Sequence, residues 1–465
     1  MARIVWVLWG SGCAGGRSGG DRWRSDMLCV GARWCAPTII GLAFVACRGP
    51  SQPSQSVPES PMAVHEAVSG EDGEPQGPLL LLPQAQFVWV EGEDGQRKPQ
   101  PGPAKLVVLR PSATGFTSEI IEDGDSRVFH KAQCLRRGAG ERQIMTIGGT
   151  DAHLKTWRRE VGAWRGTSHW KGVFGGRWDR LRDVERGDVD GDGEAELVIG
   201  THDQGVIVVA KPVGDGFDVR RIFAQPDTFI HEIEIGDVDG DGHPEIYATP
   251  SEPNKADKSQ DGRLIALLAA EGGHFQPQVV AAFAGRHAKE ILVSDIDGDG
   301  HDELYVAVEA KTIQEDRARR VLEPLEIRRY RKSVGGAWQG EPIARLPGGL
   351  QARVLVAGDP TGRGGKDIVV TTWKAGVWRL QPTDRGLWQK ELIDAHSGGF
   401  EHAATLADLD GDGQEELYVS SEDDDAVRCY RYDKPAAGKS GKFRRTDVWT
   451  LARDDIVWSI EACMP

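Results

Sequence analysis

The sequence lacks any excess of positive charge. Lys and Arg number 56 against 71 Asp and Glu, which gives a formal net charge of −15. Nucleic-acid binding needs a clustered basic surface, and an anionic membrane attracts polybasic segments, so both are disfavoured as partners. Long hydrophobic runs are also scarce. The apolar stretch at residues 36–46 is too short for a membrane-spanning helix, which needs about 20 residues.

Common catalytic signatures are missing as well. The sequence has no nucleophile elbow, no HExxH, no phosphate-cradling Gly-rich loop and no paired Cys/His metal spacing. What it does have is 39% apolar residues, 59 Gly and 15 Trp. This composition supports a large core and is typical of many short strands joined by tight turns.

The N-terminal region has the layout of a secretory signal. Arg33 precedes the apolar stretch 36–46, which ends in small residues before Cys47. Residues 44–47, FVAC, are similar to a bacterial lipobox with Phe in place of the usual Leu, which implies lipidation of Cys47; the alternative is ordinary secretion. We expect a signal region at 1–46, with Met27 as an alternative start, and a flexible lipid-anchored linker at 47–83. The expected location is the bacterial cell envelope, with the outer membrane or periplasm favoured.

An internal repeat decides the predicted fold. Four segments are close copies: GDVDGDGEAELVIGT from Gly187, GDVDGDGHPEIYATP from Gly236, SDIDGDGHDELYVAV from Ser294 and ADLDGDGQEELYVSS from Ala407. A fifth segment, from Gly358, keeps the frame but loses acids, and a sixth, from Cys134, keeps only the outline. The first Asp residues fall at 188, 237, 295, 359 and 408, a spacing of the size of a four-stranded propeller blade.

A second repeat gives an independent count. An aromatic residue before a short strand recurs seven times, at Phe116, Trp164, Phe217, Phe275, Trp338, Trp388 and Phe443. The C-terminal segment 456–464 matches the strand that precedes an acidic loop, and the region from about Gln84 to Ile121 would supply the other strands of that blade. The sequence therefore predicts an all-β, seven-bladed β-propeller over residues 84–465, closed by a blade shared between both chain ends. An eight-bladed ring and two separate sheets are the alternatives.

Each complete loop reads D-x-D-G-D-G-x-x-E. Four carboxylates within nine residues repel one another by about 1–4 kcal/mol per close pair, so the cluster favours a bound cation. Oxygen ligands without His or Cys favour Ca²⁺ over transition metals, and a flexible loop favours Ca²⁺ over Mg²⁺. The closing Glu lies at position 9 and the flanks are strands, which excludes an EF-hand.

These loops resemble the FG-GAP/VCBS repeats of calcium-loop propellers, a resemblance that extends over residues 127–465. It implies about four structural Ca²⁺ ions, held by side chains and by the backbone carbonyl at position 7. The implied ligand residues are Asp188, Asp190, Asp192, Glu194 and Glu196; Asp237, Asp239, Asp241, His243 and Glu245; Asp295, Asp297, Asp299, His301 and Glu303; and Asp408, Asp410, Asp412, Gln414 and Glu416. In the fifth loop Thr361 and Arg363 replace two Asp, so no ion is expected there.

A second candidate site lies at the opposite end of the predicted first strands. Six residues before each first Asp, around the mouth of the channel, the residue is usually cationic or an imidazole: His130, Arg182, His231, Lys289, Arg353, His402 and Trp458. Glu232, Glu290 and Glu401 are next to three of them. This ring is a candidate ligand site for an anionic or sugar-like group, although polar strand starts are common in propellers. Two long insertions, 250–262 and 309–323, are expected on the same face.

Cys134 and Cys463 end the innermost strands of adjacent predicted blades. A disulfide there would lock the ring at its closure, and two buried free thiols are the alternative.

The leading functional prediction is a calcium-stabilised, lipid-anchored binding propeller without catalysis. It would be a monomer with a protein or carbohydrate ligand, no nucleic-acid partner, and membrane contact only through its anchor. The first alternative is a sugar-acting, polysaccharide lyase-like enzyme at the channel mouth, with His231, Glu232, His287, Glu290, Glu401 and His402 as acid/base candidates. The second is a purely adhesive or structural surface protein.

Overall fold

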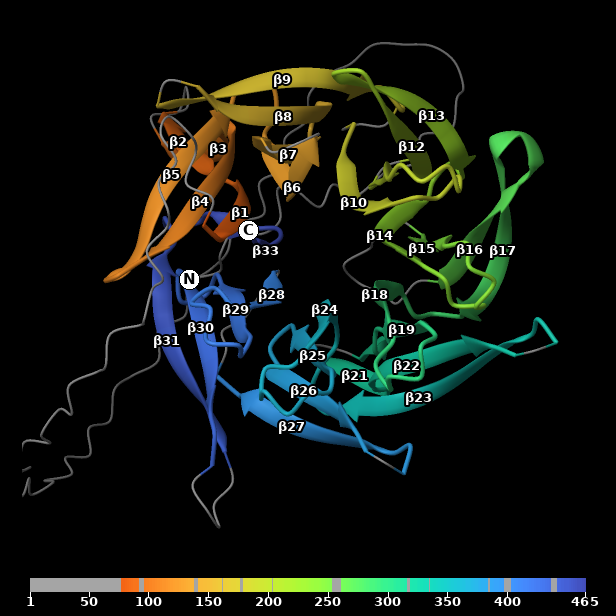
Figure 1. Cartoon of the computed structure of the whole chain (residues 1–465). Coiled ribbons are helices and arrows are strands. Elements are labelled where there is room, and N and C mark those ends of the chain that lie inside the picture. The colour runs from red at the N-terminus through yellow and green to blue at the C-terminus, as the bar shows by residue number, and fades with distance from the viewer. Residues whose placement is uncertain are drawn as a thin grey trace, which may run out of the picture.

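The computed structural model describes residues 77–465 except 92–95, 138–140, 161, 176–178, 203, 253–260, 316–317, 334, 384, 397–402 and 436–440. Within these residues the chain is built from strands arranged around a central axis (Figure 1). The predicted signal region, Cys47 and most of the predicted linker lie outside the described residues. No described helix has the length and apolar character needed to cross a membrane.

Five sheets have four antiparallel strands each, in chain order. The first contains β10 (Leu181–Gly187), β11 (Glu196–Thr201), β12 (Val206–Val213) and β13 (Gly216–Ala224). The second contains β14 (Phe229–Gly236), β15 (Glu245–Ser251), β16 (Gly262–Ala270) and β17 (His274–Phe283), with the short 3₁₀ turn η2 (Glu271–Gly273). The third contains β18 (Ala288–Ser294), β19 (Glu303–Val308), β22 (Leu325–Lys332) and β23 (Trp338–Leu346). The fourth contains β24 (Ala352–Gly358), β25 (Asp367–Thr372), β26 (Val377–Pro382) and β27 (Trp388–Asp394). The fifth contains β28 (Ala404–Ala407), β29 (Glu416–Ser421), β30 (Ala426–Asp433) and β31 (Lys442–Thr450).

The remaining large sheet has nine strands and joins the two ends of the chain. One part contains β6 (Val128–Arg137), β7 (Glu141–Gly149), β8 (Ala152–Glu160) and β9 (Ala163–Gly172). The other contains β32 (Ile456–Val457), β33 (Glu461–Cys463), β1 (Leu79–Ala85), β4 (Ala104–Ser112) and β5 (Gly115–Asp123). A single residue pair, Ala85 with Val128, connects the two parts. We interpret them as two adjacent blades.

Innermost strands contact one another in a closed circle, in the order β6, β10, β14, β18, β24, β28, β33 and back to β6. On this interpretation the propeller has the seven blades that the aromatic repeat predicts. The ring is closed as predicted, because β33 from the C-terminus pairs with β1 from the N-terminal segment. A disulfide joins Cys134 of β6 to Cys463 of β33, with 5.8 Å between their Cα atoms, so the pairing that the sequence left open is present.

The core lies between blades. Second strands such as β11 and β19 are buried along their whole length, whereas outer strands such as β13 are half exposed. Aromatic residues of the outer strands reach across to the preceding blade. Trp338 packs edge-on against Tyr247 at 6.1 Å and Trp388 against Tyr305 at 5.8 Å. The aromatic repeat is therefore a contact between blades, which explains its regular recurrence.

One predicted boundary is wrong. The linker was expected to reach residue 83, but β1 begins at Leu79, and Leu79–Leu82 are fully buried. This strand occupies the second position of its blade, where both faces are covered by neighbouring blades. A continuous apolar run is typical of a strand buried on both sides, and the Leu run belongs to the fold for that reason.

Two hairpins extend beyond the sheets. β2 (Phe87–Glu91) pairs with β3 (Arg97–Pro101), and β20 (Lys311–Glu315) pairs with β21 (Ala318–Glu323). The second hairpin forms most of the predicted insertion at 309–323. Most of the other predicted insertion, 250–262, lies outside the described residues. The sequence analysis did not identify the β2–β3 hairpin.

Candidate functional site

The acidic loops share one turn, fixed by the first Asp of each loop. Asp188 Oδ1 accepts hydrogen bonds from the backbone N–H groups of Gly191 at 2.8 Å and Asp192 at 3.1 Å, and Oδ2 accepts one from Gly193 at 2.9 Å. Gly191 and Gly193 have φ of 78° and 91°, which glycine adopts without strain. The same three bonds recur at Asp237, Asp295 and Asp408.

The turn brings carboxylate oxygens together in all four loops. In each loop, three or four carboxylate groups place one oxygen each within 4.8 Å of the others. The sets are Asp237, Asp239, Asp241 and Glu245; Asp188, Asp190 and Glu196; Asp295, Asp297 and Asp299; and Asp408, Asp410 and Glu416. These clusters could hold a metal ion. The carbonyl ligands at Glu194, His243, His301 and Gln414 stay a prediction.

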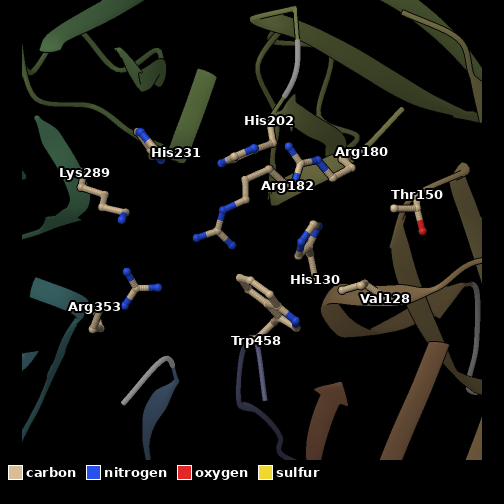
Figure 2. Close-up of a pocket in the computed structure, with 10 residues that line it drawn as sticks. All are labelled: Val128, His130, Thr150, Arg180, Arg182, His202, His231, Lys289, Arg353 and Trp458. Atoms are coloured by element: carbon tan, nitrogen blue, oxygen red, sulfur yellow. The ribbon is translucent and has the colours of Figure 1, made fainter. Parts of the chain in front are cut away.

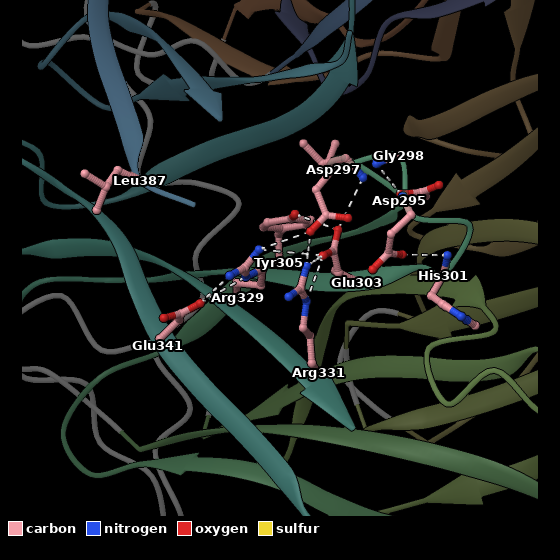
Figure 3. Close-up of polar contacts among 12 residues, drawn as sticks. Asp295, Asp297, Gly298, His301, Glu303, Tyr305, Arg329, Arg331, Glu341 and Leu387 are labelled. Carbon is pink, nitrogen blue, oxygen red and sulfur yellow. Dashed lines mark hydrogen bonds and ion pairs between the residues drawn. The ribbon is translucent and has the colours of Figure 1, made fainter. Parts of the chain in front are cut away.

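A basic side chain from a third strand contacts each of the four loops, and in the Asp237 loop this is Lys332 of the next blade, which pairs with Asp239. Lys211 lies 2.6 Å from Asp190 and 2.5 Å from Asp192, and Arg431 lies 3.1 Å from Asp412. Arg331 pairs with Asp297 and Glu303 (Figure 3). In these last three loops the carboxylate missing from the converging set (Asp192, Glu303 or Asp412) is one that the cation contacts. The basic side chain therefore competes with an ion for a ligand.

The closing glutamates are buried although they are acidic. Glu196 is 0% exposed, and its Oε1 accepts no hydrogen bond from a described residue. Asp239 Oδ1 is also buried without a described partner. Burial raises the pKa of Glu245 to about 7 and that of Glu416 to about 8. Buried carboxylate oxygens without donors fit a hard cation, which would remove the cost of keeping these groups charged.

The fifth loop keeps the turn but lacks the second and third Asp of the acidic loops. Asp359 accepts backbone hydrogen bonds from Arg363 at 3.1 Å and Gly364 at 2.6 Å. Its closing residue, Asp367, is 0% exposed and is neutralised by Arg363 at 2.5 Å and Arg379 at 2.6 Å. Two guanidinium groups therefore supply the positive charge that a metal ion would supply in the acidic loops. The expectation that this loop holds no ion stays a prediction.

A cavity lies at the other end of the first strands (Figure 2). Arg182 stands near the start of β10 and Asp188 follows its end, so the cavity and the loops are about 20 Å apart at roughly 3.3 Å per residue. The lining residues are Val128, His130, Thr150, Arg180, Arg182, His202, His231, Lys289, Arg353 and Trp458. None of these ten residues is acidic.

Cations and neutral imidazoles surround this cavity. The Arg182 guanidinium lies 5.8 Å from the centre of the Trp458 ring, and His130 meets the same ring edge-on at 5.0 Å. Burial and neighbouring cations hold the pKa values of His130, His202 and His231 well below their usual range. These imidazoles are therefore neutral at physiological pH. Burial also lowers the pKa of Lys289 to about 8.

A comparison with known families bears on the acidic loops. A model of the FG-GAP-like repeat family matches residues 188–248, which include the first two acidic loops. The chain contains an FG-GAP-like repeat. No curated protein sequence matches it.

Two crystal structures are similar in fold. A protein from Lactobacillus plantarum has a TM-score of 0.54 at 11% identity, covering 83% of this chain and 99% of its own. A candidate 6-phosphogluconolactonase from Bacteroides uniformis has a TM-score of 0.48 at 13% identity, covering 83% of this chain and 100% of its own. The first supports the propeller fold, and neither assigns an activity to this chain.

The structure gathers most of the predicted mouth residues. His130, Arg182, His231, Lys289, Arg353 and Trp458 all line the cavity, at the end of the ring away from the acidic loops. Glu232 and Glu290 do not line it, and Glu401 and His402 lie outside the described residues. Ligand binding by these residues stays a prediction.

Four lining residues were missed by the sequence analysis. His202 follows β11 in the loop between second and third strands, on the mouth face, and that position was a usable signal. Arg180 lies two residues before Arg182. Thr150 follows β7 in the same way that His202 follows β11. Val128 begins β6 and has no distinctive pattern in the sequence.

Proposed function

We propose that this chain is a calcium-stabilised binding propeller that receives a protein or carbohydrate ligand at the channel mouth. The observation that carries the proposal is the division of charge between the two ends of the first strands. Carboxylates gather in the FG-GAP-like loops, and cations with neutral imidazoles gather at the mouth. A rigid ring that presents one polar cavity is typical of binding domains on a stable scaffold.

Calcium supports this function by fixing the loops rather than by taking part in chemistry. Each loop offers hard oxygen donors, and Glu196 Oε1 and Asp239 Oδ1 are buried without described donors. These features fit Ca²⁺, which takes six to eight oxygen ligands in flexible geometry. The ions would lie about 20 Å from the cavity, too far to polarise a ligand there.

We further propose that the chain is exported and anchored by a lipid on Cys47. The lipobox-like residues 44–47 support this, and the anchor would display the ring away from the membrane on the segment that precedes β1. Metabolic labelling with a fatty acid would detect the lipid, and a Cys47→Ala chain should remain unlabelled.

One observation favours the enzymatic alternative. His231 is neutral and buried beside the cationic groups, with its ring 5.4 Å from that of His287. A neutral imidazole next to cations that bind an acidic sugar is suited to proton abstraction. Incubation with acidic oligosaccharides, followed by mass analysis of the products, separates this alternative from simple binding.

The test of binding is a thermal-shift screen of the full chain with mono- and oligosaccharides, with and without calcium. A ligand at the mouth should raise the melting temperature, and His231→Ala should remove that shift. A shift that survives this substitution would place the ligand elsewhere. Binding only to protein partners, with no sugar response, would support the adhesive alternative.

A further inference from the structure

We infer that the group recognised in the mouth cavity is an oxyanion, a carboxylate or a phosphate. This inference rests on the proposed function, since it assumes that the cavity receives a ligand. It goes further by naming the chemical class of the ligand and the side chains that select it.

The first support is that cationic side chains extend into one space. Arg182 of β10, Lys289 of β18 and Arg353 of β24 come from three different blades and extend toward the same space in Figure 2. Glu309 lies 3.5 Å from Lys289, and Glu290 interacts electrostatically with Arg182 and Arg353. Because neither carboxylate lines the cavity, the lining itself is cationic and would attract a bound oxyanion.

The second support comes from the contacts of the Arg182 side chain. No carboxylate among the described residues forms an ion pair with Arg182, and its recorded contact is with the Trp458 ring. A guanidinium placed over an aromatic ring keeps its planar donor edge available for two parallel hydrogen bonds. Carboxylate and phosphate present matching pairs of acceptor oxygens.

The third support is His231. It is 1% exposed, lines the cavity, and its Nε2 has no hydrogen-bond partner among the described residues. A buried ring nitrogen without a partner is unfavourable, so a ligand atom at this position is expected. His231 is independent of the arginines and lines the same cavity.

The lining also indicates what kind of molecule carries the oxyanion. Trp458 adds an apolar surface beside the cations, which suits the carbon frame of a sugar acid or sugar phosphate. The indole would contribute little to binding of a bare inorganic ion.

Substitution of Glu290 provides a test in which ligand binding is expected to strengthen. Glu290 follows Lys289 in β18, is 4% exposed, and its Oε1 has no hydrogen-bond partner among the described residues. It does not line the cavity but interacts electrostatically with Arg182, Arg353 and Lys289, so its charge offsets their attraction for an anion. Removing that charge should therefore strengthen binding, whereas removing Arg182 should weaken it.

The experiment is calorimetric titration of the full chain in calcium with glucuronate, glucose 6-phosphate, inorganic phosphate and glucose. At least one charged probe should bind ten times or more tightly than glucose, and its affinity should fall as salt is added. Binding of glucuronate alone identifies a carboxylate ligand. Binding of glucose 6-phosphate, with no binding of inorganic phosphate, identifies a sugar phosphate. Similar binding of all three charged probes identifies a site for the free anion.

Variants locate the site. Arg182→Gln should weaken the charged probe about tenfold or more, Glu290→Gln should tighten it, and Arg444→Gln on the outer strand β31 should leave it unchanged. Melting curves verify that each variant is folded. Equal affinity for glucose and the charged probes, no binding of any charged probe, unchanged affinity in Arg182→Gln, or weaker binding in Glu290→Gln would each overturn the inference. A sugar or protein ligand that binds without charge preference would leave the proposed function intact.

Discussion

The loop at Asp359 and the four acidic loops form the same turn but balance their charge differently. In both kinds the first Asp accepts backbone N–H groups four and five residues ahead: Asp192 and Gly193 for Asp188, Arg363 and Gly364 for Asp359. Asp367 then meets two guanidinium groups, whereas the Oε1 atom of Glu196 accepts no described hydrogen bond and has a single ammonium group, Lys211, at 3.6 Å. The second and third Asp are therefore not needed for the turn, and their carboxylates are available to a cation.

A second difference separates the acidic loops from one another. Lys211, Arg331 and Arg431 each stand on the third strand opposite the closing glutamate. At that position the loop of Asp237 has Leu268, one residue beyond the Ile246–Leu267 pair, and its basic contact is instead Lys332 of the next blade, which pairs with Asp239 but not with the closing Glu245. Only in this loop do all four carboxylates of the described cluster converge. We therefore expect the Asp237 loop to bind its ion most tightly.

Removing calcium from the whole chain should have the largest effect. Each ion stabilises the folded state by about 2.7 kcal/mol when free calcium is 100 times its dissociation constant, so four ions would contribute roughly 10 kcal/mol. A chelator should lower the melting temperature steeply, and added calcium should restore it. An unchanged melting curve in chelator would remove the calcium account of these loops.

Glu245→Gln should abolish the binding of one calcium ion, so it should lower stability only when calcium is present. The variant should lose about 2.7 kcal/mol of unfolding free energy in calcium-saturated buffer. In chelator it should be as stable as the parent or more stable, because a buried carboxylate that lacks a cation is unfavourable. Denaturant unfolding under both conditions measures the difference. Equal destabilisation under both conditions would mean that Glu245 acts through packing alone.

Asp367→Asn, the matched change in the fifth loop, should be independent of calcium. It leaves Arg363 and Arg379 without their shared buried carboxylate, although Arg379 retains Glu391 at 2.5 Å. We expect a loss of about 2 kcal/mol, below the usual range for breaking a buried pair because that partner remains. The same unfolding experiment should give this loss with and without calcium. A calcium-dependent loss would show that the fifth loop also binds an ion.

The smallest effect is expected from the residue opposite the closing glutamate. Lys211→Met should tighten calcium binding by a small factor, because the ammonium group no longer competes with the ion for Asp190 and Asp192 and such exposed pairs are weak. Leu268→Lys should weaken binding at the Asp237 loop by a similar factor. Calcium titration by calorimetry measures both, with Lys171→Met on the outer strand β9 as the control. A change of the same sign in both variants would contradict competition between side chain and ion.

Local repetition made much of this structure predictable. The D-x-D-G-D-G-x-x-E loops and the seven aromatic positions recur in sequence, so they indicated the blades, the acidic clusters and the closure by both chain ends. Lys211 and Arg431 were missed, because their contact with the loops depends on strand register rather than on sequence spacing. The start of β1 was missed, because a Leu run beside a polar segment does not show which strands will cover it. His202 and Arg180 were missed, because they reach the mouth from connections outside the counted repeat position.

The most direct test of the account is an anomalous difference map from crystals of the chain grown with calcium. The account predicts four peaks, one within each cluster that begins at Asp188, Asp237, Asp295 and Asp408, and none beside Asp359. The absence of peaks in the acidic loops, or a peak between Asp359 and Asp367, would contradict it.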